Sequence, residues 1–247
     1  MENLDRDARE TGSHTMTASQ AVLQGLTPDG GLFVPLTLPT ANFDFDQLAT
    51  MSYQEVAYEV LKLFFTDYTA DELHACIDAA YGDQFDDPQI APVTKHGQQY
   101  YLELFHGPTI AFKDLALQIL PHLMTTAVKK NHLQAEVVIL AATSGDTGKA
   151  AMAGFANVDQ TRIIVFYPKD GVSAIQKQQM VTQTGANTSV VAINGNFDEA
   201  QTTVKKLLND HQLHAELATH QFQFSSANSI NIGRLFPQVA YYVYTYA

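Results

Sequence analysis

A lysine in an apolar setting is the residue of this sequence best suited to act as a nucleophile. Lys113 lies six residues after Gly107, directly follows Phe112, and precedes a stretch with a helical pattern. Partial burial favours the neutral form of an amine, which can form a Schiff base with an aldehyde. The positive end of a helix dipole disfavours an ordinary lysine at this place. The spacing leaves two interpretations open, a reactive amine or a surface lysine that starts a helix.

A run of small and polar residues lies between a predicted strand and a predicted helix. Its members are Thr143, Ser144, Gly145, Asp146 and Thr147. Backbone N–H groups at the start of a helix can bind an anion. The run lacks the first glycine and the final Ser or Thr of a nucleotide P-loop, and the chain has no Gly-x-Gly-x-x-Gly motif. The sequence therefore predicts a cradle for a carboxylate or phosphate, with ordinary helix capping as the alternative.

A third polar segment follows the last predicted strand. It contains Asn228, Ser229, Asn231 and Arg234. Arginine can bind a phosphate through two hydrogen bonds at once, so this segment indicates a phosphate site. The alternative is a polar helix cap with a surface arginine.

The elements that must position these residues form two regions. Residues 1–92 carry helix-capping patterns and predict a small, mainly helical domain, with Pro88 and Pro92 near its end. In residues 93–247, apolar strand-like runs alternate with helical patterns, which predicts an α/β fold with a parallel sheet. We expect residues 136–226 to form a small parallel subdomain. Ligands of such sheets bind at the carboxyl ends of the strands, where all three polar segments fall.

Composition excludes several classes of partner. The chain has 14 Lys and Arg against 26 Asp and Glu, a net charge of −12, so we expect neither nucleic acid nor a membrane as a partner. The single cysteine and the lack of a long apolar run favour a cytoplasmic protein. His211, His214 and His220 lack the Cys or Glu spacing of known metal sites, so no metal is predicted.

The last segment, residues 235–246, is apolar on all sides of a predicted helix. A helix of this kind is normally buried. We therefore expect the chain to be a truncated piece whose C-terminal part is missing. A native end docked in a groove, or an oligomer interface, is the alternative.

Taken together, these segments resemble the threonine synthase family, which depends on pyridoxal 5′-phosphate (PLP) and has the tryptophan synthase β-like fold. The resemblance covers about residues 17–247. The matches to the wider lysine-attachment signature are Glu103, Thr109, Ala111, Phe112, Lys113, Asp114 and Ala116. The narrower matches are 106–114, 143–148, 168–180 and 227–234.

This resemblance implies a three-layer parallel-sheet fold and a role for each polar segment. Lys113 would hold PLP as a Schiff base, and Asp146 would lie beside the 3′-oxygen of the cofactor. The substrate's carboxylate would be bound by Thr143, Ser144, Gly145 and Thr147. The substrate's phosphate would lie near Asn228, Ser229, Asn231 and Arg234.

The implied reaction converts O-phospho-L-homoserine and water to L-threonine and phosphate, the last step of threonine biosynthesis. The whole protein is expected to be a monomer. In the family, the loop that holds the phosphate of PLP follows the tyrosine-rich helix, so we expect residues 1–247 alone to be inactive. Two alternatives remain: a related PLP-dependent serine or threonine dehydratase, and a non-catalytic module that binds anions.

Overall fold

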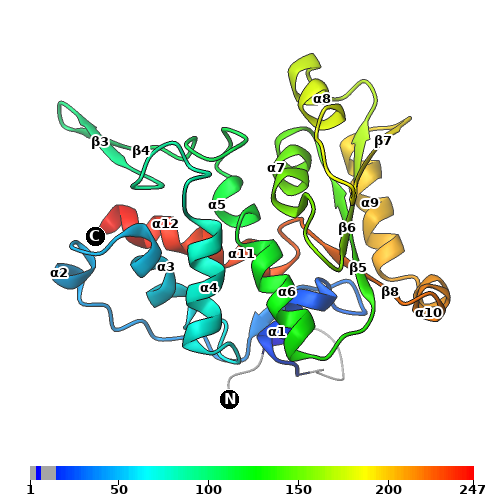
Figure 1. The fold of residues 1–247 in the computed structure, drawn as a ribbon, viewed down its shortest axis with the longest axis horizontal. Helices are drawn as coiled ribbons and strands as arrows, with labels where there is room; N and C mark the ends of the chain where they lie inside the picture. The colour runs from blue at the N-terminus through cyan, green and yellow to red at the C-terminus, as the bar shows by residue number, and fades with distance from the viewer. Residues whose placement is uncertain (1–3, 7–14) are drawn as a thin grey trace.

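A four-stranded parallel sheet organises the second part of the chain. The computed structural model describes residues 4–6 and 15–247 (Figure 1). The strands are β5 (Glu136–Ala142), β6 (Thr161–Pro168), β7 (Thr188–Ile193) and β8 (Phe222–Ser226), in the order β7-β6-β5-β8. Every pairing is parallel. The α/β fold class with a parallel sheet, expected from the alternating pattern, is confirmed.

Helices cover both faces of this sheet, which makes three layers. Helix α7 (Asp146–Phe155) packs on one face, and α9 (Phe197–Leu208) packs on the other (Figure 1). The central strand β5 is apolar beyond its first residue because it is buried on both faces. Helices α8 (Ala174–Val181) and α10 (His211–Thr219) complete this region. The sequence patterns did not predict α10, although Asp210 caps it by accepting hydrogen bonds from two backbone N–H groups.

The first part of the chain is mainly helical. Its elements are β1 (Leu4–Arg6), α1 (Ala18–Gln24), β2 (Phe33–Pro35), α2 (Phe45–Leu48), α3 (Tyr53–Leu61) and α4 (Ala70–Ala80). The capping boxes predicted at the starts of α3 and α4 are both present, with Ser52 and Thr69 as the cap residues. A hairpin of β3 (Val93–His96) and β4 (Gln99–Leu102) follows and extends away from the body (Figure 1).

The hydrophobic core continues from the helical region into the last helices, α11 (Ile232–Leu235) and α12 (Pro237–Tyr246). Phe64 stacks on Phe236, with ring centroids 4.2 Å apart, and α12 packs along α3. Helix α12 buries Ala240 and Tyr241 but leaves Tyr242 exposed, so it is buried on one side rather than all round. No helix among residues 4–6 and 15–247 is long and apolar enough to cross a membrane.

The helical pattern that follows Lys113 forms two helices, α5 (Asp114–Leu117) and α6 (Leu120–Lys130). Pro121 causes the break because it has no N–H to donate to the Leu117 carbonyl four residues earlier. That carbonyl instead faces Gly154 of α7, where a Cβ atom would lie far inside contact distance. The close approach brings the helix that follows Lys113 against the helix that starts at Asp146.

We expect Gly154→Ala to destabilise the protein, although alanine normally favours a helix by about 1 kcal/mol over glycine. The added methyl group collides with backbone that cannot move aside cheaply, so the free energy of unfolding should fall by about 1–3 kcal/mol. Urea denaturation of the full-length protein measures this. An increase in the denaturation midpoint would contradict the close packing of α5 and α7.

Candidate active site

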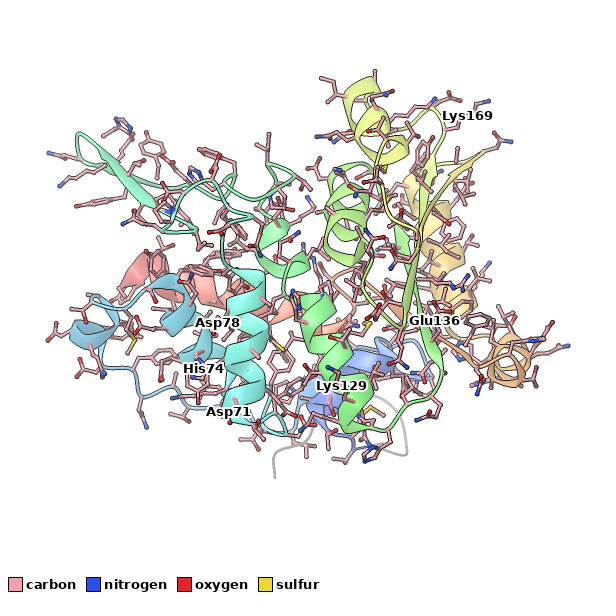
Figure 2. All side chains as sticks on the ribbon, in the orientation of Figure 1. Asp71, His74, Asp78, Lys129, Glu136 and Lys169 are labelled. Carbon is pink, nitrogen blue, oxygen red and sulfur yellow. The ribbon has the colours of Figure 1, made fainter. Side chains whose placement is uncertain are left out.

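The predicted site residues lie where the parallel strands end. Figure 2 labels Glu136 at the start of β5 and Lys169 just beyond the end of β6. The two residues mark the edge of the sheet formed by the amino ends of the strands and the edge formed by their carboxyl ends. Asn228 fixes the end of β5: its side-chain amide donates to the Ala142 carbonyl at 2.9 Å and accepts from the Ala142 N–H at 3.1 Å. The segments after β5 and β8 are thereby joined at one edge, as the strand pattern predicted.

Lys113 and Asp146 face each other at this edge. The Lys113 Nζ lies 3.5 Å from Asp146 Oδ2 and 4.4 Å from the centre of the Phe112 ring. The lysine side chain is 20% exposed and that of Asp146 48% exposed. The amine is therefore close to a carboxylate and an aromatic ring, yet still open to a small molecule.

Gln176, which the sequence patterns did not single out, holds Asp146 in place. Its Nε2 donates to Asp146 Oδ1 at 2.7 Å, while its Oε1 accepts from the Ser173 N–H at 3.2 Å. Because the capping box of α8 occupies the amide oxygen, the amide nitrogen must point toward Asp146. The pattern of Ser173 followed three residues later by Gln176 is a capping signal in the sequence, but such a pattern does not reveal what the amide nitrogen of the glutamine contacts.

We expect Gln176→Glu to slow the attachment of PLP to Lys113 about 10-fold in the full-length protein. Glutamate preserves the capping box, but its carboxylate repels that of Asp146, and the lost charge-assisted hydrogen bond is worth about 1.5–3 kcal/mol. Mass spectrometry after borohydride reduction gives the rate. Gln178→Glu adds the same charge to an exposed position of the same helix and should leave the rate unchanged. Equal rates in the two variants would show that Gln176 does not position Asp146.

The loop between β5 and α7 is shaped by the hydroxyl group of Thr143. This buried oxygen accepts hydrogen bonds from the N–H groups of Gly145 and Gly148, at 2.9 and 2.8 Å. Those two N–H groups therefore point inward. The N–H groups of Ser144, Asp146 and Thr147 bond to none of the residues that the structure describes, and they lie at the N-terminus of α7. They are the part of the predicted cradle that remains open to an anion.

Arg234 is buried and lacks hydrogen-bond partners on two of its nitrogens. The residue is 2% exposed, and neither its Nε nor its Nη1 finds a partner among the described residues. Burial lowers the pKa of Arg234 to about 10, against the opposing effect of Tyr241, Asp114 and Tyr81. A buried cation without hydrogen bonds is costly, and a bound anion would remove that cost.

Asn231 is buried, and its side chain forms hydrogen bonds within the protein. Its side-chain nitrogen donates to the carbonyls of Val22 and Ser226, at 2.8 and 3.0 Å, and its oxygen accepts from the Gly233 N–H at 2.8 Å. The amide thus caps α11 and binds α1 within the protein. Ser229 and Ser144, in contrast, are exposed at the strand ends.

The loop that precedes Lys113 is held by a buried carboxylate. Asp114 accepts from the Thr109 N–H at 2.8 Å and from the Thr109 hydroxyl at 2.7 Å. Burial raises the pKa of Asp114, although these hydrogen bonds act in the opposite direction. Between them, Ile110 has φ of 61°, an unfavourable value for a β-branched residue. This loop is a strained, tightly bonded turn rather than a flexible connection.

Comparison with known protein families and structures identifies the family to which this chain belongs. Residues 6–81 match the family described as "Threonine synthase N terminus", and residues 89–240 match "Pyridoxal-phosphate dependent enzyme". The chain is 33% identical over its whole length to threonine synthase of Eremothecium gossypii, of which it covers 50%. It is 41% identical over 92% of its length to the human protein "Threonine synthase-like 1", of which it covers 32%.

A solved structure, PLP-bound threonine synthase from Brucella melitensis, superposes on the whole chain with a TM-score of 0.84 and 35% identity. The chain covers 52% of that structure, and it spans half or less of the two curated relatives named above. The match over residues 89–240 includes Lys113, Asp146 and Arg234. The chain belongs to the pyridoxal-phosphate-dependent enzyme family and is a threonine synthase-like member of it.

Proposed function

We propose that this chain provides the reactive lysine and the substrate-binding groups of a threonine synthase, which converts O-phospho-L-homoserine and water to L-threonine and phosphate. The buried guanidinium of Arg234, whose Nε and Nη1 find no partner among the residues that the structure describes, carries the proposal. It belongs to α11, which packs against α5, the helix that begins directly after Lys113. A substrate with both an amine and a phosphate group could place its amine near Lys113 and its phosphate near Arg234.

The described residues fit the cofactor that the family uses. The Lys113 amine is accessible and faces the carboxylate of Asp146, while the ring of Phe112 provides an apolar surface beside it. When bound, PLP supplies an aldehyde for the amine and a conjugated ring that withdraws electrons from the α-carbon of the substrate. Lys113 and Asp146 are the residues of this chain that we assign to holding it.

The other residues would bind the substrate and control its protons. The open N–H groups at Ser144 and Thr147 bind the carboxylate, and Arg234 binds the phosphate group and stabilises its charge as it leaves. We assign to Lys113 Nζ the removal of the α-proton and then of a β-proton, after which water would add to the β-carbon. A single base that moves several protons must be well oriented. The contact with Asp146, fixed by Gln176, provides that orientation.

Arg234 also discriminates between the enzymatic alternatives. A serine or threonine dehydratase acts on a substrate without phosphate and has no use for a buried guanidinium. A non-catalytic module would not need an accessible lysine that faces a carboxylate.

The test is to supply the full-length protein with PLP and with each substrate in turn. We expect threonine and inorganic phosphate from O-phospho-L-homoserine, in equal amounts. Release of pyruvate from serine or 2-oxobutanoate from threonine, at a higher kcat/KM, would instead identify a dehydratase. No turnover of any of the three would support the binding module.

A further inference from the structure

His106 lies between two carboxylates at the base of the loop that leads to Lys113. Its Nδ1 is 2.6 Å from Asp86 Oδ1, and its Nε2 is 3.0 Å from Glu103 Oε2. The His106 side chain is 14% exposed, that of Glu103 24%, and that of Asp86 79%. Each ring nitrogen thus faces an acceptor, and neither carboxylate has a proton to donate at neutral pH.

This geometry requires a particular protonation state of the ring. A neutral imidazole carries one N–H group and could donate to only one of the two carboxylates. The lone pair of its unprotonated nitrogen would then point at a lone pair of a carboxylate oxygen, and the two would repel each other. The imidazolium donates to both, and each hydrogen bond is then charge-assisted and stronger.

The same ring connects three segments of the chain. Glu103, at the end of the β3–β4 hairpin, also accepts from the Thr94 hydroxyl of β3 at 2.9 Å. Asp86 belongs to the segment after α4, and its N–H donates to the His106 carbonyl at 3.0 Å. His106 is followed directly by Gly107, whose backbone packs against Asp114. The hairpin, the segment after α4 and the lysine loop therefore meet at this imidazole.

We propose that His106, in its doubly protonated form, is a positioning residue that fixes the Lys113 loop against the β3–β4 hairpin and the segment after α4. Any effect of His106 on catalysis rests on the function proposed for Lys113. Its effect on the order of the loop does not, so an experiment can contradict one of these effects without contradicting the other.

The charges around the ring determine the pH range of the effect. Burial lowers the pKa of His106, but hydrogen bonds with Glu103 and Asp86 and the charge of Asp87 outweigh it, so the pKa lies above its ordinary value. Hydrogen bonds from His106 and Thr94 lower the pKa of Glu103, and the charge of His96 acts in the same direction. Asp114 is a further ionisable group against this loop and lies on the other side of Gly107.

Because the pKa of His106 is raised in the folded state, its protonation adds to the free energy of unfolding. The stabilisation is fully present below the unfolded value, about 6.5 for histidine, and it is lost as the pH rises through the folded value. The stabilisation of the Lys113 loop by protonated His106 should therefore be complete at pH 5.5–6 and lost in alkaline solution.

The direct test is NMR of the full-length protein with 15N-labelled histidine. We expect both ring nitrogens of His106 to carry protons at pH 6.5 and to titrate above that pH. A ring that titrates at or below pH 6.5 would overturn the proposal, and this measurement needs no variant that must fold.

The second test is hydrogen exchange in His106→Gln at pH 6. We expect the amides of residues 104–112 to exchange about 5-fold faster than in the wild type, the factor that corresponds to about 1 kcal/mol. The melting temperature should fall by about 2–4 °C at pH 6 and by less at pH 9. His220→Gln removes an exposed imidazole and is the matched control. Unchanged exchange in residues 104–112, or a melting difference that does not depend on pH, would show that the ring has no positioning role.

Discussion

We expect Lys113→Ala, made in the full-length protein, to abolish the covalent attachment of PLP and to lower turnover by about 10²–10⁴-fold or more. The reason is geometric, because Lys113 is the lysine whose amine lies 3.5 Å from Asp146 at the carboxyl edge of the sheet. Alanine removes the amine without adding volume to the site. Borohydride reduction followed by mass spectrometry detects the attachment, and threonine formation gives the rate.

Lys169→Ala is the matched control for this change. Lys169 lies at the same edge of the sheet, just beyond β6, and is exposed (Figure 2). Its loss should leave both attachment and turnover as in the wild type. A PLP adduct that persists in Lys113→Ala would assign the reactive amine to another lysine.

Arg234→Met should have two opposite effects in the full-length protein. Without ligand, the free energy of unfolding should rise by about 1–3 kcal/mol, because an apolar side chain of similar length replaces a buried cation with unpaired nitrogens. With ligand, binding of the phosphorylated substrate should weaken by 2 kcal/mol or more, which is roughly a 30-fold increase in its Kd. Denaturation with and without inorganic phosphate measures both effects.

The conservative variant Arg234→Lys separates charge from geometry. Lysine keeps the positive charge but cannot form two parallel hydrogen bonds, so it should retain part of the protection by phosphate and none of the added stability. If Arg234→Met instead destabilises the ligand-free protein, the guanidinium is already stabilised there and the phosphate assignment loses its support.

The position of Asp146 could be predicted from the sequence, whereas the position of Lys113 depends on packing between helices. Asp146 directly follows the loop after β5, a strand of the parallel sheet, but Lys113 follows the β3–β4 hairpin, which is antiparallel and separate from that sheet. In a parallel sheet the loop after β5 must lie at the carboxyl ends of the strands, while the packing of α5 against α7 brings Lys113 to the same place. The strands of the parallel sheet give a clear sequence signal because β5 and much of β6 are buried and therefore apolar.

The parts that sequence patterns missed depend on contacts between distant segments. Gln176 and Asn231 are both ordinary capping residues by pattern, yet one reaches Asp146 and the other reaches Val22. Nothing local indicates either partner. The left-handed conformation of Ile110 has no sequence signal either, because the residue type argues against it. The roles of Ser144, Thr147, Asn228 and Ser229 toward a substrate stay predictions.

The bonds of Asn231 to Val22 have a consequence for how the chain folds during its synthesis. These residues are 209 positions apart, and Ser225 also donates to the Val22 carbonyl from a separation of 203. At about 5–20 residues per second, a ribosome needs roughly 10–40 s to make the intervening chain. For that time α1 and the helices beside it lack the partners that α11 and α12 supply. The N-terminal region of this protein, although made first, is thus among the last to reach its final packing.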